Sequence, residues 1–151
     1  MPDVYMNLSQ PYAAEFSKII QQKPNKDGLF TIYSELGGDN TGYLLYIDDI
    51  PAALTAITRK GDNQFEVADF YVLPYFRKNK VGKQFISELF NLLGGSWEIK
   101  QVAGADHATT FWRDVINDYT AGRFSEDKYQ DEVWGLVTRQ QFDHALLALM
   151  L

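Results

Sequence analysis

The chain has 151 residues, of which 46% are hydrophobic and 15% aromatic, and it carries a formal net charge of −6. This length and apolar content exclude a disordered chain and predict a single globular domain over residues 1–151. The absence of cysteine from the sequence excludes disulfides, cysteine-ligated zinc and a thiol nucleophile. No apolar run approaches the roughly 18 residues of a membrane span, and no secretory signal pattern opens the chain, so we expect a cytoplasmic protein.

The first predicted element is an amphipathic helix near the N-terminus. Asn7 or Ser9 can cap this helix, and Pro11 then falls in its first turn, where a missing N–H costs little. Helical spacing places four apolar side chains on one stripe: Tyr12, Phe16, Ile19 and Ile20. The Pro- and Gly-containing segment at residues 23–28 ends the helix, and a strand is predicted over residues 29–34.

A strand-like period begins after the Gly-rich loop at residues 37–42. Residues 43–47, 52–60 and 64–73 are predicted as three successive strands, joined by tight turns rich in Asp, Gly and Asn. Strands joined by such short turns indicate an antiparallel meander.

A helix is predicted from Val81 to Leu93, where Gly94-Gly95 ends it, and a short strand follows at residues 96–102. A strand, a helix and a strand of these lengths form a crossover unit, so the strand at residues 96–102 is expected to lie parallel to the strand at residues 64–73. The sequence therefore predicts a mixed α/β domain with one parallel pair in a mostly antiparallel sheet.

The last third of the chain predicts one more helix and one more strand. Asp106 can cap a helix whose apolar face runs as far as Tyr119. A polar stretch at residues 120–131 separates this helix from a final strand at residues 132–139. The tail is apolar and helix-prone, and residues 145–151 are expected either to pack on the domain or to form a dimer contact, which leaves a monomer or a homodimer.

A basic loop lies between the third strand of the meander and the helix that follows it. Four cations and no acid occupy residues 77–83: Arg77, Lys78, Lys80 and Lys83. A strand that leads through a basic, Gly-containing loop to a helix N-terminus is typical of an anion site, because unsatisfied N–H groups and the helix dipole favour phosphate there. A small basic region on an acidic chain favours a local anion site over a broad nucleic-acid surface.

Other phosphate and hydrolase motifs are absent from the sequence. Gly82-Lys83 is followed by Gln84 and lacks the upstream glycine of a P-loop. No G-x-G-x-x-G, G-x-S-x-G or H-E-x-x-H is present. His107 and His144 have no clustered ligands around them, so no metal site is predicted.

The string V-L-P-Y-F-R-K-N-K-V-G at residues 72–82 resembles the acetyl-CoA loop of the GNAT superfamily of N-acetyltransferases. The family pattern is V-x-P-x-x-[RQ]-x-x-G-x-[GA], which Val72, Pro74, Arg77 and Gly82 match, while Lys80 replaces the first glycine. The order of predicted elements is also similar to that of the family across nearly the whole chain. The resemblance implies a GNAT-like fold, acetyl-CoA as cosubstrate and an amine acceptor, either a small molecule or a peptide.

The resemblance also implies roles for the loop residues. Val72 and Leu73 would contact pantetheine, and a cradle for the CoA pyrophosphate would be formed by Arg77, Lys78, Asn79, Lys80, Val81, Gly82 and Lys83. At position 80 a lysine either adopts a left-handed backbone at about 1 kcal/mol or keeps ordinary dihedrals and places its ammonium on phosphate.

A second family pattern, N-x-x-A-x-x-[LF]-Y, falls on residues 105–112. Ala108 and Phe111 match it, but Ala105 replaces the Asn and Trp112 replaces the Tyr that often protonates the departing thiolate. An indole N–H donates a hydrogen bond and is no general acid near neutral pH. Trp112 is therefore predicted to be a core aromatic, with Tyr119 as a distant substitute.

Transfer to an amine requires removal of a proton from the ammonium. The resemblance places Asp69 where many members carry an acid at the acceptor site, and Glu66 where some carry a catalytic Glu. A separation of three residues puts the two carboxylates on opposite faces of a regular strand. Asp69 is the favoured base, and a solvated face is the favoured environment for Glu66.

Two other functions remain open from the sequence. The losses at Ala105 and Trp112 fit a module that binds acyl-CoA without transferring the acyl group. A small nucleic-acid or anion-binding protein could use the basic loop together with Tyr71, Tyr75 and Phe76, but the negative net charge disfavours it. We therefore expect neither a nucleic-acid partner nor a membrane partner.

Overall fold

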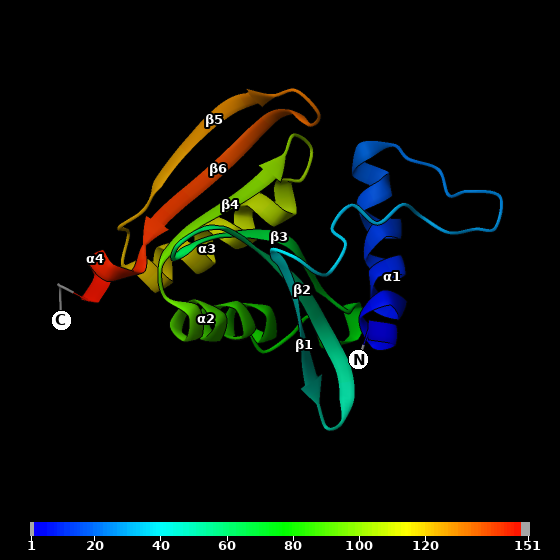
Figure 1. Ribbon diagram of the computed structural model, residues 1–151, viewed down its shortest axis with the longest axis horizontal. Helices are drawn as coiled ribbons and strands as arrows, with labels where there is room; N and C mark the ends of the chain where they lie inside the picture. Colours follow the sequence, from blue (N-terminus) through cyan, green and yellow to red (C-terminus); the bar gives the residue numbers. More distant parts are fainter. Residues whose placement is uncertain (1, 149–151) are drawn as a thin grey trace. The chain divides into compact units, whose positions relative to one another are not determined.

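A computed structural model describes residues 2–148 of the chain (Figure 1). Its elements in chain order are α1 (Pro2–Ile20), β1 (Asn40–Ile47), β2 (Ile50–Gly61), β3 (Gln64–Val72), the 3-10 turn η1 (Pro74–Phe76), α2 (Val81–Leu93), β4 (Ser96–Val102), α3 (Asp106–Thr120), β5 (Ser125–Asp131), β6 (Gly135–Asp143) and α4 (His144–Ala148). Among the described residues, no helix has the length and apolar character needed to cross a membrane.

The six strands form one open sheet in the order β1-β2-β3-β4-β6-β5. β3 pairs with β4 in parallel, beginning at Gln64 opposite Ser96, whereas β6 pairs antiparallel with both β4 and β5. The parallel pair confirms the crossover predicted from the strand–helix–strand pattern. The mixed α/β fold class is likewise confirmed.

The chain divides into two compact units, which are described separately. The first contains Met1–Ile57 and Ala68–Gly82, and the second contains Thr58–Val67 and Lys83–Leu151. The first unit therefore holds α1 and residues 77–82 of the basic loop, and the second holds Lys83 and the rest of α2 together with α3, β4, β5 and β6.

In the first unit, α1 contributes an aromatic stripe to the core. Tyr5, Leu54, Ala56 and Tyr71 are buried together. The ring of Tyr12 lies 5.6 Å from that of Tyr71. Because aromatic burial of this kind stabilises a helix far more than intrinsic propensity does, α1 holds despite an internal proline.

The start of α1 is a correction to the sequence prediction. The helix begins at Pro2, so Asn7 and Ser9 lie inside it and neither is its cap, and Pro11 is an interior residue. The hydroxyl of Ser9 donates to the carbonyl of Met6 at 2.8 Å, a bond that a serine inside a helix commonly makes.

The strand predicted over residues 29–34 is also wrong, because this segment has no regular secondary structure. The side chain of Gln10 takes the place of a strand neighbour. Its Nε2 donates to the carbonyl of Phe30 at 3.1 Å, and its Oε1 accepts from the N–H of Phe30 at 2.9 Å. A single amide on α1 thus satisfies backbone groups that would otherwise require a ladder.

Gln10→Ala is expected to destabilise the first unit by about 1–2 kcal/mol, because both backbone groups of Phe30 lose their partner. Thermal unfolding measures this loss, and Lys18→Ala is the control at an exposed position of α1 outside the Phe30 contact. Equal melting temperatures for the Gln10 variant and the wild type would contradict the assignment.

In the second unit, the core gathers around Phe90 of α2. Its ring packs edge-to-face on Trp97 at 4.7 Å and on Phe142 at 5.0 Å. Gly94 adopts φ 60° directly after the last residue of α2, as predicted for the helix end. The N-cap of α3 is Ala105 rather than Asp106, and no side chain caps that helix.

The C-terminal strands differ from the sequence prediction. Residues 125–131 form the edge strand β5, and the last strand is β6, which begins at Gly135 rather than at residue 132 (Figure 1). Cross-strand ion pairs explain how so polar a segment forms a strand: Arg139 contacts Asp127 at 2.6 Å. In the tail, α4 is confirmed over residues 144–148, and the rest of the tail prediction lies outside the described residues.

Candidate functional site

The basic loop leaves β3 through a short 3-10 turn that begins at Pro74. The N–H of Phe76 donates to the carbonyl of Leu73 at 2.9 Å, and the N–H of Arg77 donates to that of Pro74 at 3.2 Å. Four residues later α2 begins. The first N–H groups of any α-helix have no partner within the helix. The N–H of Val81 donates to the carbonyl of Lys78 at 3.3 Å, so the donors that the start of α2 can offer begin with Gly82.

Two consecutive residues of the loop have a left-handed backbone, Asn79 with φ 56° and Lys80 with φ 58°. Of the two possibilities for position 80, the lysine therefore adopts the left-handed backbone. Its side chain remains exposed.

Lys80→Gly is expected to stabilise the folded protein by up to about 1 kcal/mol, because glycine has no Cβ clash at positive φ. Lys78→Gly is the matched control, since position 78 has no positive φ and gains nothing from glycine. Chemical denaturation of both variants measures the difference, and a Lys80 variant that is less stable than the Lys78 variant would contradict this reading of the loop.

Arg77 and Lys78 use their charges within the first unit. The Nε of Arg77 donates to the carbonyl of Val72 at 2.7 Å, and its terminal NH2 donates to the carboxylate of Glu15 at 3.0 Å and 3.2 Å. The ammonium of Lys78 lies 4.7 Å from the centre of the Tyr75 ring.

Lys83 lies on α2 in the second unit. Its ammonium donates a hydrogen bond to Asp118 and lies 3.6 Å from Asp114. The hydrogen bond with Asp118 raises the pKa of Lys83, so this cation stays charged well above neutral pH. Carboxylates therefore pair with two of the four cations in the basic segment, Arg77 and Lys83.

Asp69, the favoured base, is half-buried in the first unit. Burial raises the pKa of its carboxyl, and hydrogen bonds from Ser34 and Tyr12 oppose that rise. The net direction is upward, which is suitable for a group that must accept a proton. The hydroxyl of Tyr5 is buried and has no hydrogen-bond partner among the described residues, and the negative charge of Asp69 adds to burial in raising its pKa.

Glu66 lies in the second unit and has a different environment. Its carboxylate lies 2.8 Å from the ammonium of Lys100 and 4.0 Å from that of Lys60, and its side chain is 17% exposed. The carboxylate is thus ion-paired on the sheet rather than freely solvated.

Trp112 is buried at 5% exposure, as predicted for a core aromatic. Tyr119 is also committed to packing. Its hydroxyl donates to Asn91 at 2.6 Å, and its ring packs on Phe90 and Phe142. Burial raises the pKa of Tyr119, which makes it a poorer acid still.

Three side chains that contact Arg77 or Asp69 were not predicted as site residues from the sequence: Tyr12, Glu15 and Ser34. Tyr12 was visible only as one member of an apolar stripe. Glu15 lies one residue outside that stripe, and its partner Arg77 is 62 residues away. No local pattern predicts a contact across such a separation.

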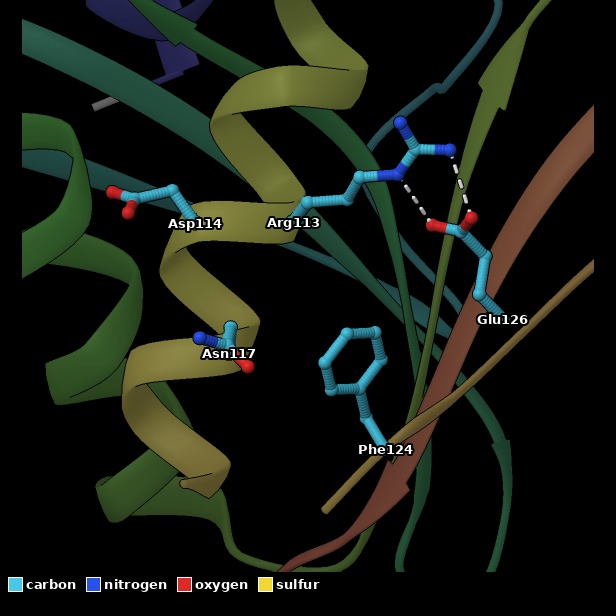
Figure 2. A pocket seen from close by; sticks show the side chains of 5 residues that line it. All are labelled: Arg113, Asp114, Asn117, Phe124 and Glu126. Carbon is cyan, nitrogen blue, oxygen red and sulfur yellow. Dashed lines mark hydrogen bonds and ion pairs between the residues drawn. The ribbon is translucent and has the colours of Figure 1, made fainter. Parts of the chain in front are cut away.

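The second unit also has an open pocket between α3 and β5, lined by Arg113, Asp114, Asn117, Phe124 and Glu126 (Figure 2). Arg113 and Glu126 face each other in a two-pronged pair with both N–O distances 2.8 Å. Glu126 also accepts from Gln140, whose amide is buried. Arg113 and Glu126 therefore neutralise each other at this pocket, while Asp114 lies 3.6 Å from Lys83 of α2.

The fold defines the class of protein that this chain resembles, because the parallel pair in its sheet and the basic loop after β3 are those expected from the resemblance to the GNAT superfamily. No family model and no curated protein matches the sequence. Solved structures do match, and their names are those of acetyltransferases.

Three of these structures illustrate the likeness. The ribosomal-protein-S18-alanine N-acetyltransferase of Escherichia coli is 13% identical over 72% of this chain and 72% of its own, with a TM-score of 0.55. A spermidine N-acetyltransferase chimera from Vibrio cholerae and hSSAT is 10% identical over 74% of this chain and 72% of its own, with a TM-score of 0.57. A Bacillus anthracis protein in complex with acetyl coenzyme A is 11% identical over 71% of this chain and 64% of its own, with a TM-score of 0.56.

At these identities the comparisons establish the fold, and the chain has the fold of the GNAT acetyltransferases. It spans somewhat less than two thirds of the length of the Bacillus anthracis protein.

Proposed function

We propose that this chain is an acetyl-CoA-dependent N-acetyltransferase, in which an amine attacks the thioester directly. The observation that carries the proposal is the loop after β3, whose left-handed residues Asn79 and Lys80 lead into the N-terminus of α2 within a GNAT fold. Such a loop suits a pyrophosphate, because backbone N–H groups and the helix dipole both favour an anion. Several of the similar structures contain CoA or acetyl-CoA, which supports the choice of cosubstrate.

The loop residues receive the following roles. Val72 and Leu73 contact pantetheine. The surroundings of the pyrophosphate are formed by the four cations and the three uncharged residues between them: Arg77, Lys78, Asn79, Lys80, Val81, Gly82 and Lys83. The backbone of Leu73 is already engaged, since its N–H donates to Ala52 at 2.9 Å and its carbonyl accepts from Phe76. Leu73 would therefore contact pantetheine through its side chain, and the N–H that polarises the thioester carbonyl is assigned to Val72.

Asp69 is assigned as the group that takes the proton from the acceptor ammonium. The neutral amine forms a C–N bond with the acetyl carbon, the C–S bond breaks, and CoA departs as a thiolate. The nitrogen, which is positively charged after the attack, releases its remaining extra proton to water to give the neutral amide. Burial of Asp69 favours proton uptake, as its raised pKa indicates. Water protonates the thiolate, because neither Trp112 nor Tyr119 is a suitable acid. Glu66 remains a second candidate for the base, with its pairing to Lys100 against it.

A domain that binds acyl-CoA without transfer is the second candidate. The burial of Trp112 and the engagement of Tyr119 favour it, since both leave the family's acid without a counterpart. The two functions make the same prediction for CoA binding and different predictions for turnover.

The experiment is release of free CoA thiol from acetyl-CoA in the presence of an amine panel. The panel includes spermidine and a peptide with an N-terminal alanine, because two similar structures bear the names of enzymes for such acceptors. Amine-dependent thiol release supports the transferase. Tight CoA binding with no release across the panel favours the binding module.

A further inference from the structure

Arg77 makes more contacts with the protein than a guanidinium reserved for a ligand would make. Its Nε donates to Val72, its NH2 spans both carboxylate oxygens of Glu15, and its plane lies 5.3 Å from the centre of the Tyr71 ring. The hydroxyl of Tyr71 donates to the same carboxylate. One face of the guanidinium and one edge are thus held by the first unit.

The three ionisable groups hold one another in fixed protonation states. Partial burial opposes ionisation of Glu15, but hydrogen bonds from Arg77 and Tyr71 prevail and lower its pKa. Burial, together with the Glu15 carboxylate, raises the pKa of Tyr71 to about 12. At neutral pH the carboxylate is therefore charged, the phenol is protonated and the guanidinium is cationic, as the contacts require.

These contacts tie the loop to α1. Tyr75 and Lys78 interact within the loop itself, and Tyr75 is 74% exposed. The structure describes residues 74–80 in full. Among them, Arg77 is the residue whose side chain donates hydrogen bonds to residues outside the loop. Loss of Glu15 would leave the loop attached mainly by its two ends.

We propose that Glu15 is a positioning residue for the cofactor loop, and that Arg77 holds the shape of the loop rather than a phosphate. Glu15 on α1 fixes the guanidinium, the guanidinium fixes the carbonyl of Val72, and the loop is thereby held in the conformation that presents its N–H groups. This inference rests on the proposed CoA-binding function and assigns Tyr71 as the second ligand of the Glu15 carboxylate.

The test is the CoA dissociation constant measured by calorimetry for wild type, Glu15→Gln, Arg77→Gln and the double variant. Each single change is expected to weaken binding about tenfold, and the double variant is expected to bind no more weakly than Arg77→Gln, because both changes break one unit. Arg77→Lys is expected to behave like Arg77→Gln, since lysine keeps the charge and loses the two-pronged geometry. Glu88→Gln, an exposed charge change on α2, should leave affinity within about twofold.

Two results would overturn the inference. Unchanged or tighter CoA binding by Glu15→Gln would make Glu15 a bystander or a competitor of the phosphate. Retained affinity in Arg77→Lys would make Arg77 a direct phosphate ligand.

A separate readout keeps the inference testable if the wild type binds no CoA and the proposed function fails. Trypsin cleavage after Lys78 and Lys80 should be faster in folded Glu15→Gln than in wild type or Glu88→Gln, because the loop is released from α1. Equal cleavage rates in Glu15→Gln and wild type would contradict the role of Glu15, whatever the result of the CoA titration.

Discussion

Simultaneous reversal of charge at Arg77 and Lys83 is expected to weaken CoA binding about a hundredfold or more. A glutamate at position 77 cannot hold the loop against Glu15 and would repel phosphate, so binding falls whether Arg77 acts through the loop or on the ligand. A glutamate at position 83 would be repelled by Asp114 and Asp118, which now form ion pairs with the lysine. Charge-assisted hydrogen bonds contribute roughly 1.5–3 kcal/mol each, which makes a hundredfold effect a modest expectation for two of them.

The measurement is calorimetric titration with CoA, and the control for net charge is the double variant Lys23→Glu and Lys26→Glu, which also reverses two cations. Both lysines are exposed in the loop that follows α1, and the structure shows no ion pair for either among the described residues. Circular dichroism establishes that the double variant is folded. Affinity within threefold of wild type in a folded double variant would remove the basic loop from cofactor binding.

Asp69→Asn is expected to lower kcat about a hundredfold while changing the affinity for CoA less than threefold. General base catalysis typically contributes a factor of about a hundred or more, and asparagine cannot accept the proton. The acid limb of the pH profile of wild-type kcat/KM should lie above the value for an ordinary aspartate, because the pKa of Asp69 is raised.

The same substitution is expected to preserve or increase stability at neutral pH. The folded-state pKa of Asp69 lies above its ordinary value of 3.8, so the folded protein binds this proton more tightly than the unfolded chain. The stability from this group is fully present below about pH 4 and is lost as pH rises through the raised pKa. A neutral asparagine does not undergo that loss.

Asp39→Asn is the control for Asp69→Asn, because Asp39 is an exposed carboxylate of the same unit. Thermal unfolding between pH 4 and pH 8 tests the stability claim, and steady-state kinetics tests the catalytic claim. Full activity in the Asp69 variant would exclude it from the mechanism. A marked loss of stability at pH 7 would show that its carboxylate is structural.

The sequence predicted the elements whose apolar period is strong and whose ends carry glycine or a tight turn. The meander, α2 and the parallel pair of β3 with β4 are of this kind. The predictions failed where a tertiary contact overrides local preference. Gln10 replaces a strand beside Phe30, and ion pairs to Arg113 and Arg139 support the polar strand β5.

The candidate site divides in the same way. The loop follows a local motif, so its residues could be named from the sequence, whereas the motif left two backbone conformations open for Lys80, of which the structure has the left-handed one. The partners of the loop could not be named. Glu15, Tyr12 and Ser34 reach Arg77 and Asp69 from segments whose own sequence carries no sign of the contact.

The central claim is that the loop at residues 77–83 binds the pyrophosphate of CoA. Titration calorimetry of the wild-type chain with acetyl-CoA, with 3′,5′-ADP and with pantetheine tests it most directly. The account predicts saturable binding of acetyl-CoA and much weaker binding of either fragment, because neither fragment contains the pyrophosphate. No binding of acetyl-CoA, or equal binding of acetyl-CoA and pantetheine, would contradict the account.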